Sequence, residues 1–305
     1  MPDGDMPARL RHLALALSLA LAALWLPGCQ RGPGPGMAPA APVEAAALRP
    51  VDAVYLLRDR LLARDGAGFA RLAVPPALHA ELETAWAQGR SRWPLDELPL
   101  DAHIPGMLAA LQVPQADKAL MATFRRQFAN ADRDIDQAIR TLMVFGGEYV
   151  QNDPEYDPDA RDHIAQAIAA VGGWALAAPL ADPKRAQRFF ATLSAAAVRS
   201  GIDGKAGNAA FAALGMTQSL NRLSPFLATL LAQLRQQYGL DIDATLRGMH
   251  VTLERQTGDD AMLRVQYTLG GHPVDARMPA VRIDGHWYLA GYVQRARLSL
   301  GNGPG

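Results

Sequence analysis

The chain of 305 residues contains a single cysteine, Cys29, and this restricts how the protein can fold. Without a second cysteine no intrachain disulfide can form, so a folded body has to be stabilised by packing and hydrogen bonding. Half of the residues are hydrophobic, which is enough for a sizeable core in a chain of this length. The sequence therefore predicts a globular body without disulfides.

The first 28 residues have the three zones of a bacterial signal peptide. Two arginines give a basic start, an apolar stretch of 14 residues follows (Leu13–Leu26), and the small residue Gly28 precedes Cys29. The stretch is too short to span a membrane, which needs about 20 residues. Translation from Met6 in place of Met1 would give a cleaner basic start, so both remain candidate starts.

The segment Leu26-Pro27-Gly28-Cys29 resembles the lipobox of bacterial lipoprotein precursors. The resemblance implies cleavage after Gly28, a diacylglycerol on Cys29 and acylation of the new amino terminus. Three acyl chains would anchor the protein durably, because each buried methylene contributes about 0.8 kcal/mol. Gln30 is not the aspartate that retains enteric lipoproteins at the inner membrane, which favours an outer-membrane anchor facing the periplasm. The alternative is a secreted protein with a free cysteine, or a short uncleaved anchor.

Residues 29–50 are predicted to form a tether between Cys29 and the folded body. The segment has five prolines and few large apolar side chains. At about 3.1 Å per residue, an extended Pro-rich tether of this length could place the body about 60 Å from the membrane.

The charge balance argues against two classes of partner. The chain has 30 basic and 30 acidic residues, and no Lys/Arg run is longer than a pair such as Arg125-Arg126. Nucleic acids and anionic membrane surfaces both require clustered positive charge, so neither is predicted as a partner.

Apolar spacing and helix-capping residues predict a helical region over residues 51–240. Asp157-Pro158 and Asp182-Pro183 each offer a capping acid followed by proline at the first helical position. One helix, over residues 135–150, is predicted to bury the apolar side chains of Ile135, Ile139, Leu142, Met143 and Phe145. The predicted helices cover approximately residues 51–64, 76–89, 105–111, 118–129, 135–150, 158–179, 183–199, 208–214 and 219–238.

Residues 241–297 are predicted to form an antiparallel sheet. Apolar residues alternate with polar ones after Gly248, and Gly-containing turns interrupt the pattern. The predicted strands cover residues 249–256, 261–269, 273–283 and 286–295, and residues 298–305 are predicted to be a disordered tail. The fold class is therefore α+β, with a helical bundle first and a small antiparallel β-meander last.

An opening helix followed by an Asp-Gly and Phe segment (Val51–Phe69), together with a terminal meander closing on Val281–Leu289, resembles the NTF2-like α+β fold. Many bacterial lipoproteins of unknown function have this fold. The resemblance implies a cone-shaped cavity but assigns no functional residue in this chain.

Three aromatic residues and one histidine are the candidate ligand surface. Trp287, Tyr288 and Tyr292 could line a pocket on a curved sheet together with His250. The competing interpretation is core packing, because Trp287 and Leu289 share one face of a predicted strand with Val293.

No metal, cofactor or catalytic site is predicted. The acids Asp153, Glu155, Asp157 and Asp159 alternate as calcium ligands do, but the glycine and the bidentate acid of a calcium loop are missing. Helix capping explains this segment better. No histidine pair has metal-binding helical spacing, and no catalytic motif is present.

The leading functional hypothesis is a non-enzymatic envelope lipoprotein, anchored through Cys29, that binds an unidentified envelope protein or component. The alternative is a hydrolase, an isomerase or a small-molecule binder that uses a cavity between the sheet and the helices. A deep pocket with a carboxylate and a histidine within hydrogen-bond reach would favour this alternative.

Overall fold

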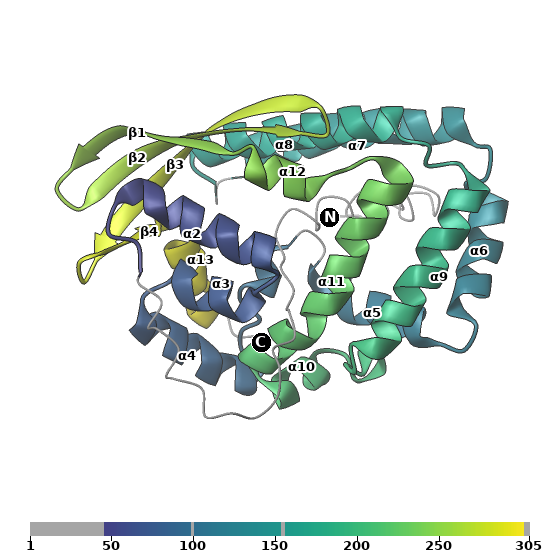
Figure 1. Ribbon diagram of the computed structural model, residues 1–305, viewed down its shortest axis with the longest axis horizontal. Helices are drawn as coiled ribbons and strands as arrows, with labels where there is room; N and C mark the ends of the chain where they lie inside the picture. Colours follow the sequence, from purple (N-terminus) through teal and green to yellow (C-terminus); the bar gives the residue numbers. More distant parts are fainter. Residues whose placement is uncertain (1–45, 99–100, 154–155, 302–305) are drawn as a thin grey trace.

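A computed structural model describes residues 46–98, 101–153 and 156–301 (Figure 1). The predicted signal peptide, the predicted lipidation residue Cys29 and most of the predicted tether lie outside the described residues. Among these residues, none of the helices is long and apolar enough to cross a membrane.

The structure is α+β, as predicted: mostly helical, with a four-stranded antiparallel sheet near the C-terminus. The helices are α2 (Pro50–Ala63), α3 (Gly66–Ala73), α4 (Pro76–Ala87), α5 (Ile104–Gln112), α6 (Ala116–Gln127), α7 (Asp132–Asn152), α8 (Pro158–Ala177), α9 (Pro183–Arg199), α10 (Asn208–Leu214), α11 (Met216–Tyr238), α12 (Ile242–Arg247) and α13 (Ala290–Gly301). Short 3-10 turns cover Leu95–Glu97 (η1), Asp101–His103 (η2) and Gly204–Ala206 (η3).

The two predicted helix caps are confirmed. The Asp157 carboxylate accepts a hydrogen bond from the backbone N–H of Ala160 at 2.8 Å, and α8 begins at Pro158. The Asp182 carboxylate accepts from the N–H of Lys184 at 2.7 Å, at the start of α9. In each case the acid satisfies donors that the first helical turn leaves open, so local chemistry fixes where the helix starts.

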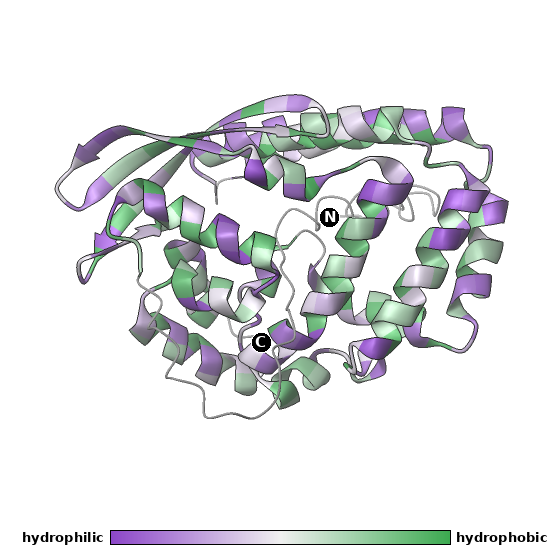
Figure 2. Ribbon diagram, in the orientation of Figure 1, coloured by the Kyte–Doolittle hydropathy of each residue, from purple (hydrophilic) through white to green (hydrophobic). Residues whose placement is uncertain are grey.

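The four strands form a simple meander in the order β1-β2-β3-β4. They are β1 (His250–Thr257), β2 (Asp260–Leu269), β3 (His272–Ile283) and β4 (His286–Leu289). The hairpin tips are hydrophilic, whereas the strands alternate hydrophilic and hydrophobic residues (Figure 2). This alternation gives the sheet one buried face and one polar face.

Helices surround the sheet unevenly (Figure 1). Helices α2, α3 and α13 lie beneath it, and α8 packs mainly along β3. Strand β4 is short and pairs only with the last four residues of β3, from Ala280 to Ile283. Helix α8 therefore covers the part of β3 that β4 does not reach.

One hydrophobic core joins the helices to the sheet. It runs from Ala47 and α2 through α11 to β2, β3 and α13, and a small second cluster lies between α6 and α9. Buried tryptophans also connect distant segments: the indole N–H of Trp86 donates to the carbonyl of Phe211 at 2.9 Å, and that of Trp174 donates to the carbonyl of Tyr238 at 2.8 Å. The helical region and the sheet thus share a core.

The C-terminal end differs from the prediction. The fourth strand was expected to reach residue 295, but β4 ends at Leu289 and α13 continues to Gly301. Tyr292, Val293 and Ala296 are buried, a spacing that suits a helix and not a strand. Residues 298–301, predicted to be disordered, belong to this helix, and residues 302–305 lie outside the described part.

One residue of the segment predicted as tether, Ala47, belongs to the folded body. Ala47 is buried, and its carbonyl accepts a hydrogen bond from the N–H of Trp287 at 2.8 Å. This isolated bridge attaches the chain to the outer edge of β4 before α2 begins at Pro50. The folded body therefore starts within the segment predicted as tether.

Candidate functional site

The structure separates the residues predicted as a ligand surface. His250 is exposed at the start of β1, whereas Trp287, Tyr288 and Tyr292 are buried at β4 and α13. Strands β1 and β4 lie at opposite edges of the sheet. His250 therefore does not share a pocket wall with the aromatic residues.

The aromatic side chains serve the core. The ring of Tyr292 packs edge-on against Phe69 of α3, with centroids 5.5 Å apart, and the Arg295 guanidinium lies 5.3 Å from its centroid. Trp287, Leu289 and Val293 are also buried, in agreement with the interpretation as packing residues.

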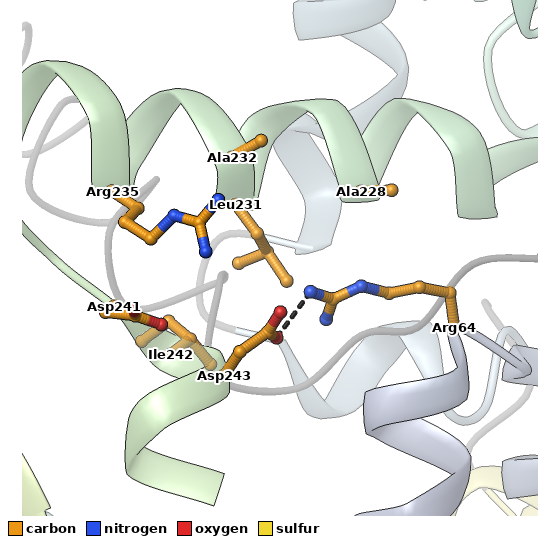
Figure 3. Close-up of a pocket in the computed structure, with 8 residues that line it drawn as sticks. All are labelled: Arg64, Ala228, Leu231, Ala232, Arg235, Asp241, Ile242 and Asp243. Atoms are coloured by element: carbon orange, nitrogen blue, oxygen red, sulfur yellow. Dashed lines mark hydrogen bonds and ion pairs between the residues drawn. The ribbon is translucent and has the colours of Figure 1, made fainter. Parts of the chain in front are cut away.

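A small, partly open cavity of about 50 Å³ lies between the C-terminal ends of α2 and α11 and the start of α12 (Figure 3). Leu231 and Ile242 form its apolar wall. Its polar side chains are Arg64, Arg235, Asp241 and Asp243. This volume holds roughly four water molecules, or one small polyatomic ion.

The charged groups of this cavity are ordered by neighbouring contacts. The Arg64 guanidinium donates to the Asp243 carboxylate, and Arg247 lies 3.7 Å from the other oxygen of that carboxylate. The Asp241 carboxylate caps α12 by accepting from the N–H of Ala244 at 2.9 Å. Both acids are therefore engaged by partners within the fold.

A second, shallower cavity of about 540 Å³ runs along α13. It has apolar side chains from Val281, Ile283, Val293 and Leu298, with Asp260 and Arg297 among its charged residues. Its volume lies in the range of small-molecule sites. It contains no histidine, so it lacks the acid–histidine pair expected of the enzymatic alternative.

A polar cluster, buried mainly at Glu97, connects η1 to α13. The Glu97 carboxylate accepts a hydrogen bond from Arg295, and the Ser299 hydroxyl donates to Asp96 at 2.8 Å. Burial raises the pKa of Glu97 to about 7, although Arg295 opposes the shift by favouring the charged carboxylate. Glu97 lines neither of the two cavities described above.

His163 forms a part-buried hydrogen bond whose partner is a tyrosine hydroxyl and not a carboxylate. His163 Nε2 on α8 lies 2.7 Å from the hydroxyl of Tyr267 on β2. Burial lowers the pKa of His163, so the neutral ring is favoured. Within the described part of the chain, no group of three or more His, Cys, Asp or Glu residues could hold a metal ion.

Helix α7 exposes an unusual apolar surface. Val144, Phe145 and Tyr149 are 60%, 65% and 70% exposed. The prediction that Phe145 is buried with Ile139 is wrong: six residues are about 240° around a helix, so the two point to different sides. Ile139 is fully buried, and α7 packs mainly against α8.

No family model, curated protein or solved structure matches the chain. The NTF2-like resemblance and the lipobox therefore remain predictions from the sequence.

Sequence reasoning missed the charged residues that the fold brings together. Arg64 and Asp243 are 179 positions apart, and Glu97 and Arg295 are 198 apart. One local signal was present in the sequence: an arginine, Arg64, follows the last residue of α2, where glycine or asparagine would be usual. In the structure Arg64 has a left-handed φ of 59°.

Proposed function

We propose that the protein is a lipid-anchored envelope protein that binds a partner at a distance from the outer membrane, on its periplasmic side. The signal peptide, the lipobox with Cys29 and the Pro-rich segment support the anchor. The Ala47–Trp287 hydrogen bond places Ala47 in the folded body, so the proposed tether consists of the residues before it.

The observation that carries partner binding is the exposed apolar surface of Val144, Phe145 and Tyr149, hereafter the α7 surface. Exposing a phenylalanine, a tyrosine and a valine together gives no packing benefit to an isolated body, whereas such clusters are common at protein interfaces. Two charges of opposite sign on α7, Arg140 and Glu148, flank the surface, so recognition by apolar contact fits it better than ionic binding.

The second candidate is a small-molecule binder, and the cavity along α13 favours it. Its volume of about 540 Å³ and its apolar wall would accept an apolar ligand. Its shallow shape and the absence of a histidine from its wall give no support to a hydrolase or isomerase.

Site-specific crosslinking in cells tests the partner hypothesis. A photoreactive residue in place of Gln151, which is exposed on α7, should yield a defined crosslinked product. Phe145→Ser should reduce that product about tenfold or more, because it removes an anchoring apolar contact. Val198→Ser is the matched control, since Val198 is 61% exposed on α9.

The tether provides an independent arm of the same experiment. Deleting residues 33–42 should also reduce the crosslinked product, because the body would no longer reach its partner. A product that persists unchanged with both Phe145→Ser and the shortened tether would contradict partner binding through the α7 surface. The small-molecule hypothesis would then take its place.

A further inference from the structure

The cavity between α2, α11 and α12 is lined by two arginines, Arg64 and Arg235, and by two aspartates, Asp241 and Asp243. Arg247 lies outside this lining and pairs with Asp243 at 3.7 Å. Asp241 already caps α12, and Asp243 already serves Arg64 and Arg247. Both carboxylates therefore have partners, so the arginine that pairs with neither of them, Arg235, is available to a negatively charged ligand.

Of the arginines at this cavity, Arg235 is the one without a structural role in the described part of the chain. It lies in the last turn of α11, and its side chain points into the cavity toward Arg64 (Figure 3). Its guanidinium forms no hydrogen bond or ion pair with another residue of the described chain. Arg64, by contrast, connects α2 to α12 through Asp243.

The backbone conformation at position 64 indicates that this position needs the arginine side chain. Arg64 has a φ of 59°, a conformation that glycine adopts at far lower cost at a helix end. Its side chain is only 17% exposed, so the guanidinium is held at the cavity and does not extend into solvent. Strain of this kind persists where the surrounding structure requires that side chain.

We infer that Arg64 and Arg235 form an anion site that takes a phosphate group. Guanidinium groups donate several parallel hydrogen bonds, and a tetrahedral phosphate can accept from two of them at once. The cavity of about 50 Å³ admits one such group and excludes a larger ligand body, which would have to remain outside. The phosphate could belong to a soluble compound or to a lipid headgroup, and the site is independent of the anchor at Cys29.

Calorimetric titration of the mature protein with inorganic phosphate, with chloride at equal ionic strength as reference, tests the site. Arg235→Gln should weaken phosphate binding at least tenfold. Arg199→Gln is the matched control, because Arg199 is also exposed in the last turn of a helix, α9, and should leave binding unchanged. Asp243→Asn should strengthen binding several-fold, since it releases Arg64 and removes a nearby negative charge.

The opposite signs of these two changes distinguish a site from non-specific attraction. Absence of saturable phosphate binding in excess of chloride would overturn the inference. Equal losses with Arg235→Gln and Arg199→Gln would overturn it as well. Acetate binding as tightly as phosphate would exclude phosphate as the preferred group.

Vesicle flotation identifies the source of the phosphate. The mature chain carrying Cys29→Ser is mixed with phosphatidylcholine vesicles, with or without phosphatidic acid. Flotation that requires phosphatidic acid and is lost with Arg235→Gln assigns a lipid headgroup. Binding of inorganic phosphate without such flotation assigns a soluble phosphate compound.

Discussion

The side-chain amide of Gln166 on α8 pairs with both main-chain polar groups of Asp275 on β3. Gln166 Nε2 donates to the Asp275 carbonyl at 2.9 Å, and Gln166 Oε1 accepts from the Asp275 N–H at 2.8 Å. The amide thus copies the hydrogen bonds that a neighbouring strand would make. It therefore satisfies the backbone N–H and carbonyl of β3 at a position that β4 does not reach.

Gln166→Ala should therefore destabilise the protein by about 1–3 kcal/mol, since each of two hydrogen bonds contributes about 0.5–1.5 kcal/mol. Urea unfolding measures the loss, and hydrogen exchange should show a less protected Asp275 amide. Gln187→Ala, at an exposed glutamine of α9, controls for the change in helix propensity and should cost little. Equal effects of the two substitutions would show that the Asp275 pairing is unimportant.

Gly270 should tolerate alanine far less well than its neighbour Gly271. Both have positive φ, of 57° and 89°. A Cβ on Gly270 would lie 2.5 Å from the Cβ of Trp174, whereas a Cβ on Gly271 would meet nothing within 4 Å. The backbone strain is shared, so the difference between the two variants in thermal or urea unfolding reports the clash. We expect Gly270→Ala to cost at least about 1–3 kcal/mol more, the usual penalty of overpacking.

Glu97 should make the protein less stable as the pH rises. Burial raises the pKa of Glu97 in the folded state from 4.5 to about 7, so the folded state binds this proton more tightly than the unfolded state does. Its contribution to stability is full below pH 4.5 and is lost as the pH rises through about 7. The loss is at most about 3 kcal/mol, at 1.36 kcal/mol per pKa unit.

Glu97→Gln removes the ionisation and should flatten this part of the profile. Urea unfolding from pH 4 to pH 9 should show the variant gaining stability relative to the wild type as the pH rises. Parallel profiles for the two proteins would contradict the assignment of the raised pKa to Glu97.

His163 should change the stability of the protein with pH in the direction opposite to Glu97. Burial lowers its pKa below the ordinary 6.5, so the stability it contributes is present above pH 6.5 and is lost as the pH falls through the folded-state value. Tyr267→Phe should cost about 1–3 kcal/mol at pH 8, because it leaves a partly buried ring nitrogen of His163 unpaired. Unfolding measurements that show no cost for Tyr267→Phe would mean that water replaces the hydroxyl.

The sequence predicted the elements best where local chemistry decides them. Asp157-Pro158 and Asp182-Pro183 act within one helical turn, and period-two alternation is strong in β2 and β3. The chain after Leu289 was predicted wrongly, because Tyr292 and Val293 suit a strand by propensity. In the fold this segment is a helix that packs against β3 and α4, with Tyr292 against Phe69 of α3.

The sites were beyond sequence reasoning for a different reason. Arg64 meets Asp243, and Glu97 meets Arg295, only when segments far apart in the chain fold together. A single sequence contains no signal for such pairings. Phe145 shows the converse: its hydrophobicity suggested burial, but its angular position on α7 leaves it exposed.

The most direct test of the central proposal is the fate of Cys29→Ser in cells fed radiolabelled palmitate. The anchored protein should incorporate label and sediment with outer membranes. Cys29→Ser should incorporate none and should appear as an uncleaved or soluble form, because no other segment of the leader resembles a lipid attachment site. A Cys29→Ser protein that is cleaved normally and still sediments with outer membranes would contradict the lipid anchor.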